Sequence, residues 1–100
     1  MCELFSHQPQ ENYQIIAKSI RIDGHATSIK LEASFWHILE EIGQLQGMTL
    51  PKFITTIYSE ALIYNRQIKN FTSLLRCACL IYLRQPENVM SNIYQQLQIP

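Results

Sequence analysis

Hydrophobic residues alternate with polar ones on both sides of the dipeptide Asp23-Gly24. Ile20 and Ile22 alternate with polar neighbours from Lys18 onward, and the alternation resumes after the glycine and continues to Leu31. A period of two is typical of a β-strand with one buried face, and Asp-Gly favours a two-residue turn because glycine tolerates positive φ. The pattern therefore predicts an antiparallel hairpin.

The turn also predicts which residues face each other. With Asp23 and Gly24 as the loop, Ile22 lies opposite His25 and Ser19 lies opposite Ser28. One face of the hairpin then carries the mainly apolar set Ile20, Ile22, Thr27, Ile29 and Leu31. The other face carries a polar and basic row, Ser19, Arg21, Ala26, Ser28 and Lys30. We predict that this row is the contact surface.

The hydrophobic spacing changes to that of helices after the second strand. Ser34 is expected to cap a helix that runs to about Leu45, Gly47 to adopt a left-handed conformation, and Thr49 to start the next helix with Pro51 in its first turn. The positions predicted to form the core or a dimer interface are Ile29, Leu31, Phe35, Trp36, Leu39, Ile54, Ile57 and Tyr58.

Two further helical patterns follow. Thr72 or Ser73 opens a third predicted helix that is apolar on nearly every side, so it should be central or interfacial, and Pro86 ends it. A weaker amphipathic pattern then marks a fourth helix, with apolar residues Val89, Met90, Ile93, Tyr94 and Leu97. We predict three segments: a flexible arm over 1–17, a hairpin and two helices over 18–64, and a helical extension over 65–100 packed on the same domain.

Composition bounds the class of protein. One hundred residues with 47% hydrophobic content suit one globular domain whose core gains from dimerisation, and the formal net charge is zero. Three cysteines form no even set, so we expect reduced thiols and no disulfide framework. The chain has neither an apolar run long enough to span a membrane nor the pattern of a signal peptide, which predicts a cytoplasmic protein.

Several separated segments resemble the bacterial ribbon-helix-helix proteins. The resemblance is carried by Gly24-His25-Ala26-Thr27-Ser28, Phe35-Trp36, Leu39-Glu40-Glu41-Ile42, Gly47-Met48-Thr49-Leu50 and Asn70-Phe71-Thr72-Ser73-Leu74-Leu75-Arg76. It implies an α+β, mostly α fold: a homodimer in which a strand pairs antiparallel with its copy and enters the major groove of double-stranded DNA. The N-terminal hairpin strand and the C-terminal helices exceed the minimal unit of that group.

The resemblance implies roles for individual residues. Ala26, Ser28 and Lys30 occupy the outward, base-facing strand positions, with Arg21 added by the hairpin. Ala26 offers only apolar contact, which shifts hydrogen-bonded readout toward Arg21. The second helix begins near the expected phosphate contacts, which are Met48, Thr49, Leu50 and Lys52, joined by His25 after the turn.

Each of these residues also has an ordinary structural interpretation. Ser28 and Lys30 suit a solvated strand face, Arg21 can pair with Asp23, and His25 suits a simple turn position. Cys77 and Cys79 invite a metal or redox hypothesis, but residues two apart on a helix point about 200° apart. Trp36 suits the core better than a base-stacking role.

The sequence therefore predicts a DNA-binding transcriptional regulator, a repressor or autoregulator. The alternative is a protein-interaction module, antitoxin-like or adaptor-like, in which the C-terminal helices of the same dimer bind another protein. A helical oligomer without a nucleic-acid role is a third hypothesis. No residue spacing supports catalysis, a cofactor or a metal site, so we do not expect an enzyme.

Overall fold

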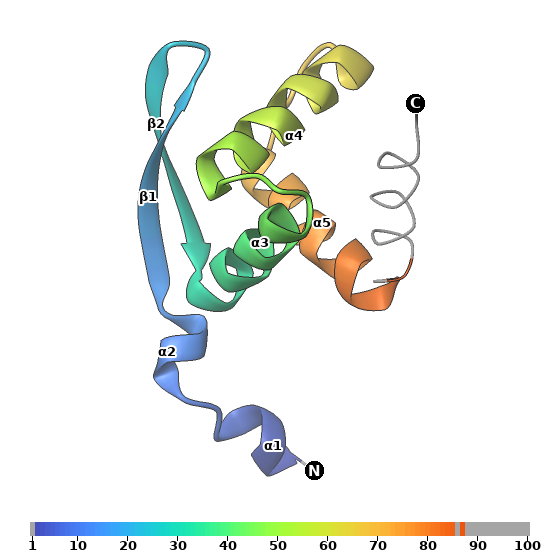
Figure 1. The fold of residues 1–100 in the computed structure, drawn as a ribbon. Coiled ribbons are helices and arrows are strands. Elements are labelled where there is room, and N and C mark those ends of the chain that lie inside the picture. Colours follow the sequence, from blue (N-terminus) through green and yellow to red (C-terminus); the bar gives the residue numbers. More distant parts are fainter. Residues whose placement is uncertain (1, 86, 88–100) are drawn as a thin grey trace.

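A β-hairpin lies against three helices, and two short helices extend from one end of this body (Figure 1). The computed structural model describes residues 2–85 and residue 87. The elements in chain order are α1 (Cys2–Ser6), α2 (Gln10–Tyr13), β1 (Ile15–Ile22), β2 (His25–Glu32), α3 (Ala33–Leu45), α4 (Leu50–Asn65) and α5 (Phe71–Arg84). The predicted fourth helix falls outside the described residues. None of the described helices is long and apolar enough to cross a membrane.

The hairpin has the predicted register. Ile22 pairs with His25 and Ser19 pairs with Ser28, so the predicted polar row lies on one face of the sheet. Asp23 and Gly24 have φ values of 52° and 79°, the combination that a type I′ turn requires. β1 begins at Ile15, three residues before the predicted start, so the arm is shorter than expected and contains the helices α1 and α2.

Trp36 joins the hairpin to the helices. It is 2% exposed, and its indole Nε1 donates to the backbone oxygen of Ile16 at 2.8 Å. The Lys18 ammonium lies 5.6 Å from the centre of the Trp36 ring, where a cation is attracted to the aromatic face. One side chain therefore fixes the angle between α3 and β1 through packing and a hydrogen bond.

The core lies between the hairpin and the helices. Its buried residues are Ile20, Ile22, Ile29, Leu31, Trp36, Leu39, Ile42, Phe53, Ile54, Leu75 and Cys79. Of the predicted core or interface positions, Phe35, Ile57 and Tyr58 are half-buried and pack against this cluster, and the other five are buried. Thr27 lies on its predicted face, since it pairs with Ile20, but it is exposed because it is near the end of the hairpin.

The helix boundaries separate correct cap predictions from wrong ones. Thr49 caps α4 by accepting from the Lys52 N–H, and Gly47 has a φ of 70°, as predicted. Ser34 is not a cap: its hydroxyl donates to the backbone oxygen of Asn12 at 2.6 Å, while Glu32 holds the cap position without a side-chain bond. The side chain of Asn70 caps α5, which places Thr72 and Ser73 inside the first turn.

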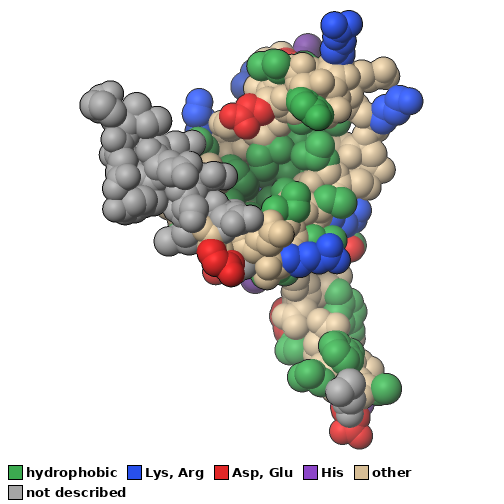
Figure 2. All heavy atoms as spheres, turned by 90° about the vertical axis from the view of Figure 1, so that its right-hand side faces the viewer, with side chains coloured by type: hydrophobic (Ala, Val, Ile, Leu, Met, Phe, Trp, Pro, Cys, Tyr) green, Lys and Arg blue, Asp and Glu red, His purple; other side chains and the backbone are tan. Residues whose placement is uncertain are grey.

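α5 buries one side and leaves another in contact with solvent. Leu75 and Cys79 have no exposed surface, whereas Leu80, Ile81 and Leu83 are exposed. One face of α5 is therefore buried in the core, and another face is apolar but exposed to solvent. The side of the molecule turned away from the hairpin shows apolar side chains gathered around a hollow (Figure 2).

We expect Trp36→Phe to lower the free energy of unfolding by about 2 kcal/mol, because a buried ring loses volume and the indole hydrogen bond is removed. Urea denaturation followed by far-UV circular dichroism measures this change. His37→Ala is the matched control, since His37 is exposed on the same turn of α3. Equal stability of the two variants would contradict the joining role of Trp36.

The three cysteines should differ in reactivity toward an aromatic disulfide reagent. Cys2 and Cys77 are exposed, whereas burial raises the pKa of the Cys79 thiol to about 11 and its Sγ donates to the Phe35 oxygen at 3.7 Å. Since the thiolate is the reacting form, we expect Cys2 and Cys77 to react at pH 8 and Cys79 to react only after denaturation. Reaction of Cys79 in the native protein would show that this part of the core opens.

Candidate nucleic-acid interface

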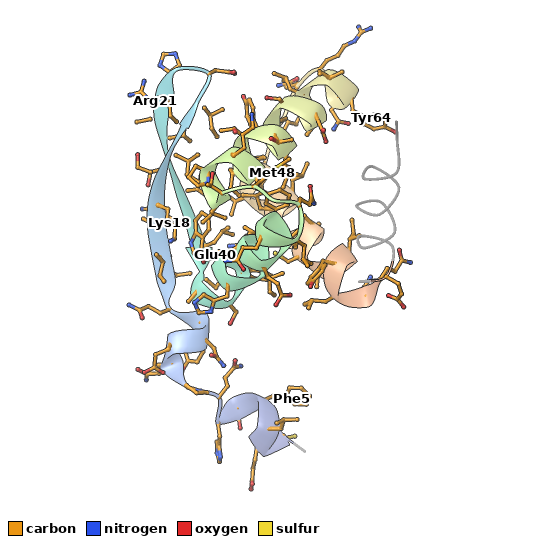
Figure 3. The ribbon with its side chains drawn as sticks, in the orientation of Figure 1. Phe5, Lys18, Arg21, Glu40, Met48 and Tyr64 are labelled. Carbon is orange, nitrogen blue, oxygen red and sulfur yellow. The ribbon has the colours of Figure 1, made fainter. Side chains whose placement is uncertain are left out.

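The outward face of the hairpin is the candidate contact surface. All four predicted base-facing residues, Arg21, Ala26, Ser28 and Lys30, are exposed on it. Strand register places them opposite the face that packs on the helices, because consecutive side chains of a strand point to opposite sides. Figure 3 shows Arg21 near the turn, on the side of the sheet away from the helices.

Arg21 has a partner within the turn. Its guanidinium Nη1 donates to the backbone oxygen of Gly24 at 3.0 Å, in place of the pairing with Asp23 that the sequence left open. This bond holds the stem of the side chain along the hairpin and leaves further guanidinium N–H groups for an anion. Arg21 is thus positioned at the tip of the sheet rather than at its centre.

The predicted contact His25 and the basic residue Lys18 lie off the outward row. His25 pairs with Ile22, so its exposed side chain belongs to the helix-facing side, at the tip of the hairpin. Lys18 pairs with Ile29 and stacks on Trp36, so it also lies on the inner side of the sheet. The outward row therefore has two basic residues, Arg21 and Lys30.

The carboxylate of Glu32 lies at the end of the same face, and its charge is balanced. Arg76 on α5 donates to Glu32 Oε1 at 3.1 Å and lies over the Phe35 ring at 5.9 Å. Backbone hydrogen bonding, and then Arg76, lower the pKa of Glu32. A lowered folded-state pKa stabilises the fold above the ordinary carboxyl range, and this contribution is lost as the pH falls through the folded value. At neutral pH the ion pair limits the repulsion between Glu32 and an approaching phosphate.

The backbone also distinguishes the two edges of the sheet. In a two-residue hairpin the residues that flank the loop exchange hydrogen bonds, and the pattern then alternates along the strands. The bond from the Ala33 N–H to the Gln14 oxygen, at 2.8 Å, continues this series at the far end. Ser19 and Ser28 therefore form a non-hydrogen-bonded pair, and their backbone groups point to opposite open edges, Ser19 along β1 and Ser28 along β2.

The start of α4 offers fewer backbone donors than the sequence predicted. The Met48 N–H donates to the Gly43 oxygen at 2.8 Å, the Lys52 N–H donates to the Thr49 hydroxyl, and Pro51 has no N–H. Thr49 and Leu50 keep the amides that can meet a phosphate in the first turn, with the exposed Lys52 ammonium beside them. Met48 is thus removed from the predicted set of phosphate donors.

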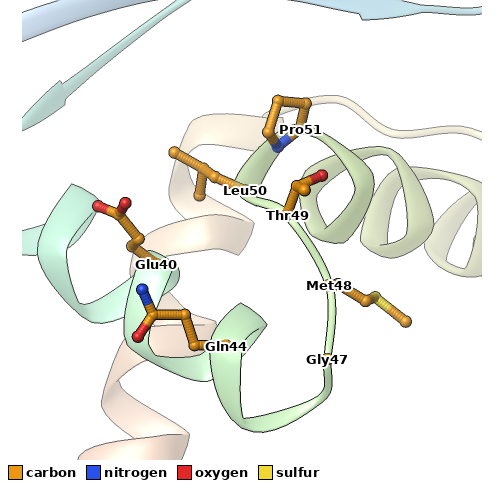
Figure 4. A pocket seen from close by; sticks show the side chains of 7 residues that line it. All are labelled: Glu40, Gln44, Gly47, Met48, Thr49, Leu50 and Pro51. Carbon is orange, nitrogen blue, oxygen red and sulfur yellow. The ribbon is translucent and has the colours of Figure 1, made fainter.

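An acidic residue shares this helix end. Glu40 and Gln44 of α3 line an open depression with residues 47–51, across from the first turn of α4 (Figure 4). A carboxylate near the positive end of a helix is favourable for the free protein and repels a phosphate. Glu40 is exposed, and the sequence alone did not place it beside the predicted phosphate contacts.

The two cysteines of α5 lie in different surroundings. Cys77 is exposed and Cys79 is buried, so the two thiols point to different environments, as their spacing on a helix predicts. Among residues 2–85 and 87, no three His, Cys, Asp or Glu side chains form a group that could hold a metal ion.

Comparison with known proteins identifies the domain. Residues 15–83 match the family model described as a ribbon-helix-helix domain. Among solved structures, the chain is similar to an uncharacterized protein from Bordetella pertussis Tohama I, with 41% sequence identity, a TM-score of 0.83, and coverage of 88% of this chain and 70% of that one. No curated protein matches the chain. The matched segment spans the hairpin and α3, α4 and α5, and the chain belongs to the ribbon-helix-helix domain family.

Proposed function

We propose that this protein is a cytoplasmic DNA-binding regulator that acts as a homodimer, a repressor or autoregulator of transcription, rather than an enzyme. Ribbon-helix-helix domains generally form dimers and are typically DNA-binding regulators. The observation that carries the proposal is the outward face of the hairpin, where Arg21, Ser28 and Lys30 are exposed and no described helix covers them. A face with hydrogen-bonding groups and positive charge suits both base edges and phosphates.

The open edge of β2 supports the proposed mode of dimerisation. β2 leads directly into α3, as the ribbon strand does in the family plan, and β1 occupies its other edge. Pairing of the two β2 strands gives a four-stranded sheet in the order β1, β2, β2 of the partner, β1 of the partner. Both outward rows then lie on one face.

The width of such a sheet divides the contacts between the strands. Three strand spacings of about 4.8 Å place the outer strands about 14 Å apart, whereas the major groove is about 12 Å wide. The two central β2 strands can enter the groove, and the outer β1 strands meet its phosphate walls. We therefore assign Ser28 and Lys30 to base edges and Arg21 to a phosphate, which revises the base-facing role that the sequence suggested for Arg21.

Neutral net charge bears on the strength of binding. Most nonspecific affinity comes from Lys and Arg contacts with phosphates, and each dimer in this arrangement brings few of them to the face. We therefore expect modest nonspecific binding and a shallow salt dependence, with base contacts supplying a larger share of the affinity for the correct site.

A protein-interaction role for the same dimer is the second candidate. It is favoured by Leu80 and Leu83 of α5, apolar side chains that are 42% and 55% exposed. An antitoxin or adaptor would use that surface while the hairpin binds DNA. Failure of a random duplex library to yield any enriched sequence with the purified protein would favour this candidate over the first.

Lys30→Ala and Arg21→Ala should weaken binding in different ways on a duplex selected with the wild-type protein. Loss of Lys30 should cost about 1–3 kcal/mol and relax preference at particular base pairs. Loss of Arg21 should weaken all duplexes alike and reduce the salt slope by about 2 per dimer, one phosphate contact from each copy. Fluorescence anisotropy over a range of salt concentrations measures both effects.

Lys69→Ala is the control for these two variants, because it removes the same charge from the exposed loop before α5. Identical losses from Lys30→Ala and Lys69→Ala would mean that net charge, and not the outward row, determines affinity.

Ser28→Pro should break the dimer, because proline removes the N–H that points to the open edge of β2 and places a ring there. Ser19→Pro is the matched control: Ser19 faces Ser28 across the hairpin and its N–H points to the edge of β1. Sedimentation equilibrium should show a monomer for Ser28→Pro and a dimer for Ser19→Pro. Dissociation by both substitutions, or by Ser19→Pro alone, would rule out pairing through β2.

A further inference from the structure

A hollow opens on the side of the molecule away from the hairpin, between α3, α4 and α5. Its apolar wall includes Met48, Phe53 and Ile57 on one side and Ile81 and Tyr82 of α5 on the other. Ile81 is 60% exposed there, and Figure 2 shows apolar side chains gathered in this hollow. A contiguous open apolar patch on a small domain marks a surface that is covered by something.

The wall formed by α5 is held in place. The Glu41 carboxylate of α3 lies close to the Tyr82 hydroxyl and is the main reason that the pKa of Tyr82 is raised. Phe53 is 6% exposed and belongs to the core, so the floor of the hollow is part of the packed interior. The hollow is therefore a preformed surface.

The last part of the sequence has the composition of an occupant. Residues 88–100 contain no charged side chain, which is not the composition of a solvated tail. Over positions 89–97, at 100° per residue, the apolar positions 89, 90, 93, 94 and 97 fall within a sector of about 140°, and the polar residues Ser91, Asn92, Gln95 and Gln96 fall outside it. A helix with this sequence presents one apolar side of the kind that the hollow accepts.

The connection is short enough for the segment to reach the hollow of its own chain. α5 ends at Arg84, and its last turns supply Ala78, Ile81 and Tyr82 to the wall. Glu87 is already helical, so positions 85 and 86 form the link, within the two to five residues or so that join antiparallel helices. A tethered segment also has an effective concentration of about 1 mM or more, which favours its own chain over a second copy.

We propose that residues 89–97 form an amphipathic helix that lies in the hollow between α4 and α5 of the same chain, with Val89, Ile93 and Leu97 turned inward. The helix completes the core on the side opposite the sheet. This inference concerns the fold of the single chain and does not depend on DNA binding.

A nitroxide spin label tests the proposal in the full-length protein. Gln95→Cys in a Cys2→Ser, Cys77→Ser background places the label on the polar side of the segment, and the buried Cys79 stays unmodified. The chain that carries both the spin label and the isotope-enriched methyl groups is mixed with an excess of chain that carries no label and no isotope. In this mixture any broadening comes from the label on the same chain. We expect the methyl signals of Ile57 and Ile81 to broaden and that of Ile15, at the start of β1, to stay sharp.

A second sample separates the copies. When the spin label and the isotope are on different chains, the methyl signals of Ile57 and Ile81 should keep their intensity. Broadening only in this mixed sample would assign the hollow to the tail of a second copy, and no broadening in either sample would leave the segment outside the hollow; both results overturn the proposal.

A pair of substitutions gives an independent measurement. Ile93→Asp puts a charge on the apolar side of the segment and should abolish the broadening and lower the urea midpoint of unfolding. Ser91→Asp puts the same charge on the polar side and should leave both unchanged. Equal effects of the two substitutions would contradict the predicted orientation.

Discussion

The two-residue turn at Asp23-Gly24 is the constraint on which the rest of the structure depends. It fixes the hairpin register, and the register determines the face to which every strand side chain points. A slip of one residue would turn Lys30 toward the helices and Ile29 toward solvent. The positive φ values of both turn residues are therefore as important to the contact surface as the basic residues themselves.

The turn also determines what the backbone can do. Because the residues flanking the loop are hydrogen-bonded to each other, the alternate residues on β2 direct their amides away from β1. The same residues, among them Ala26 and Ser28, carry the outward side chains. The same residues of β2 thus direct their backbone groups to the open edge and their side chains to the outward face. Pairing of two copies through this edge is therefore compatible with contact to a ligand through this face.

A neutral chain can still present a locally positive face, because its charges are unevenly placed. Arg76 of α5 forms an ion pair with Glu32, which leaves Arg21 and Lys30 to set the sign of the charge on the outward face of the sheet. The same distribution weakens the start of α4 as an anion site, where Glu40 lies close to the helix end. The sheet is therefore the better placed of the two predicted contact regions, and Lys52 is the cation that could offset Glu40.

Local signals predicted the hairpin, the end of α3 and the cap of α4, because each depends on residues within a few positions of one another. The failures involve long-range contacts. Ser34 bonds with Asn12, Trp36 with Ile16, and Arg76 with Glu32 across 44 positions, and no periodicity reveals such partners. For the candidate site, register was predictable from the turn, whereas the occupied Met48 amide and the position of Glu40 required the packing of α3 against α4.

β1 is the element beyond the minimal family plan that limits dimerisation most. Because β1 covers one edge of β2, two β2 strands can pair only through the other, open edge. Symmetric pairing through that edge uses the same surface on both copies, so it closes on itself instead of propagating along a filament.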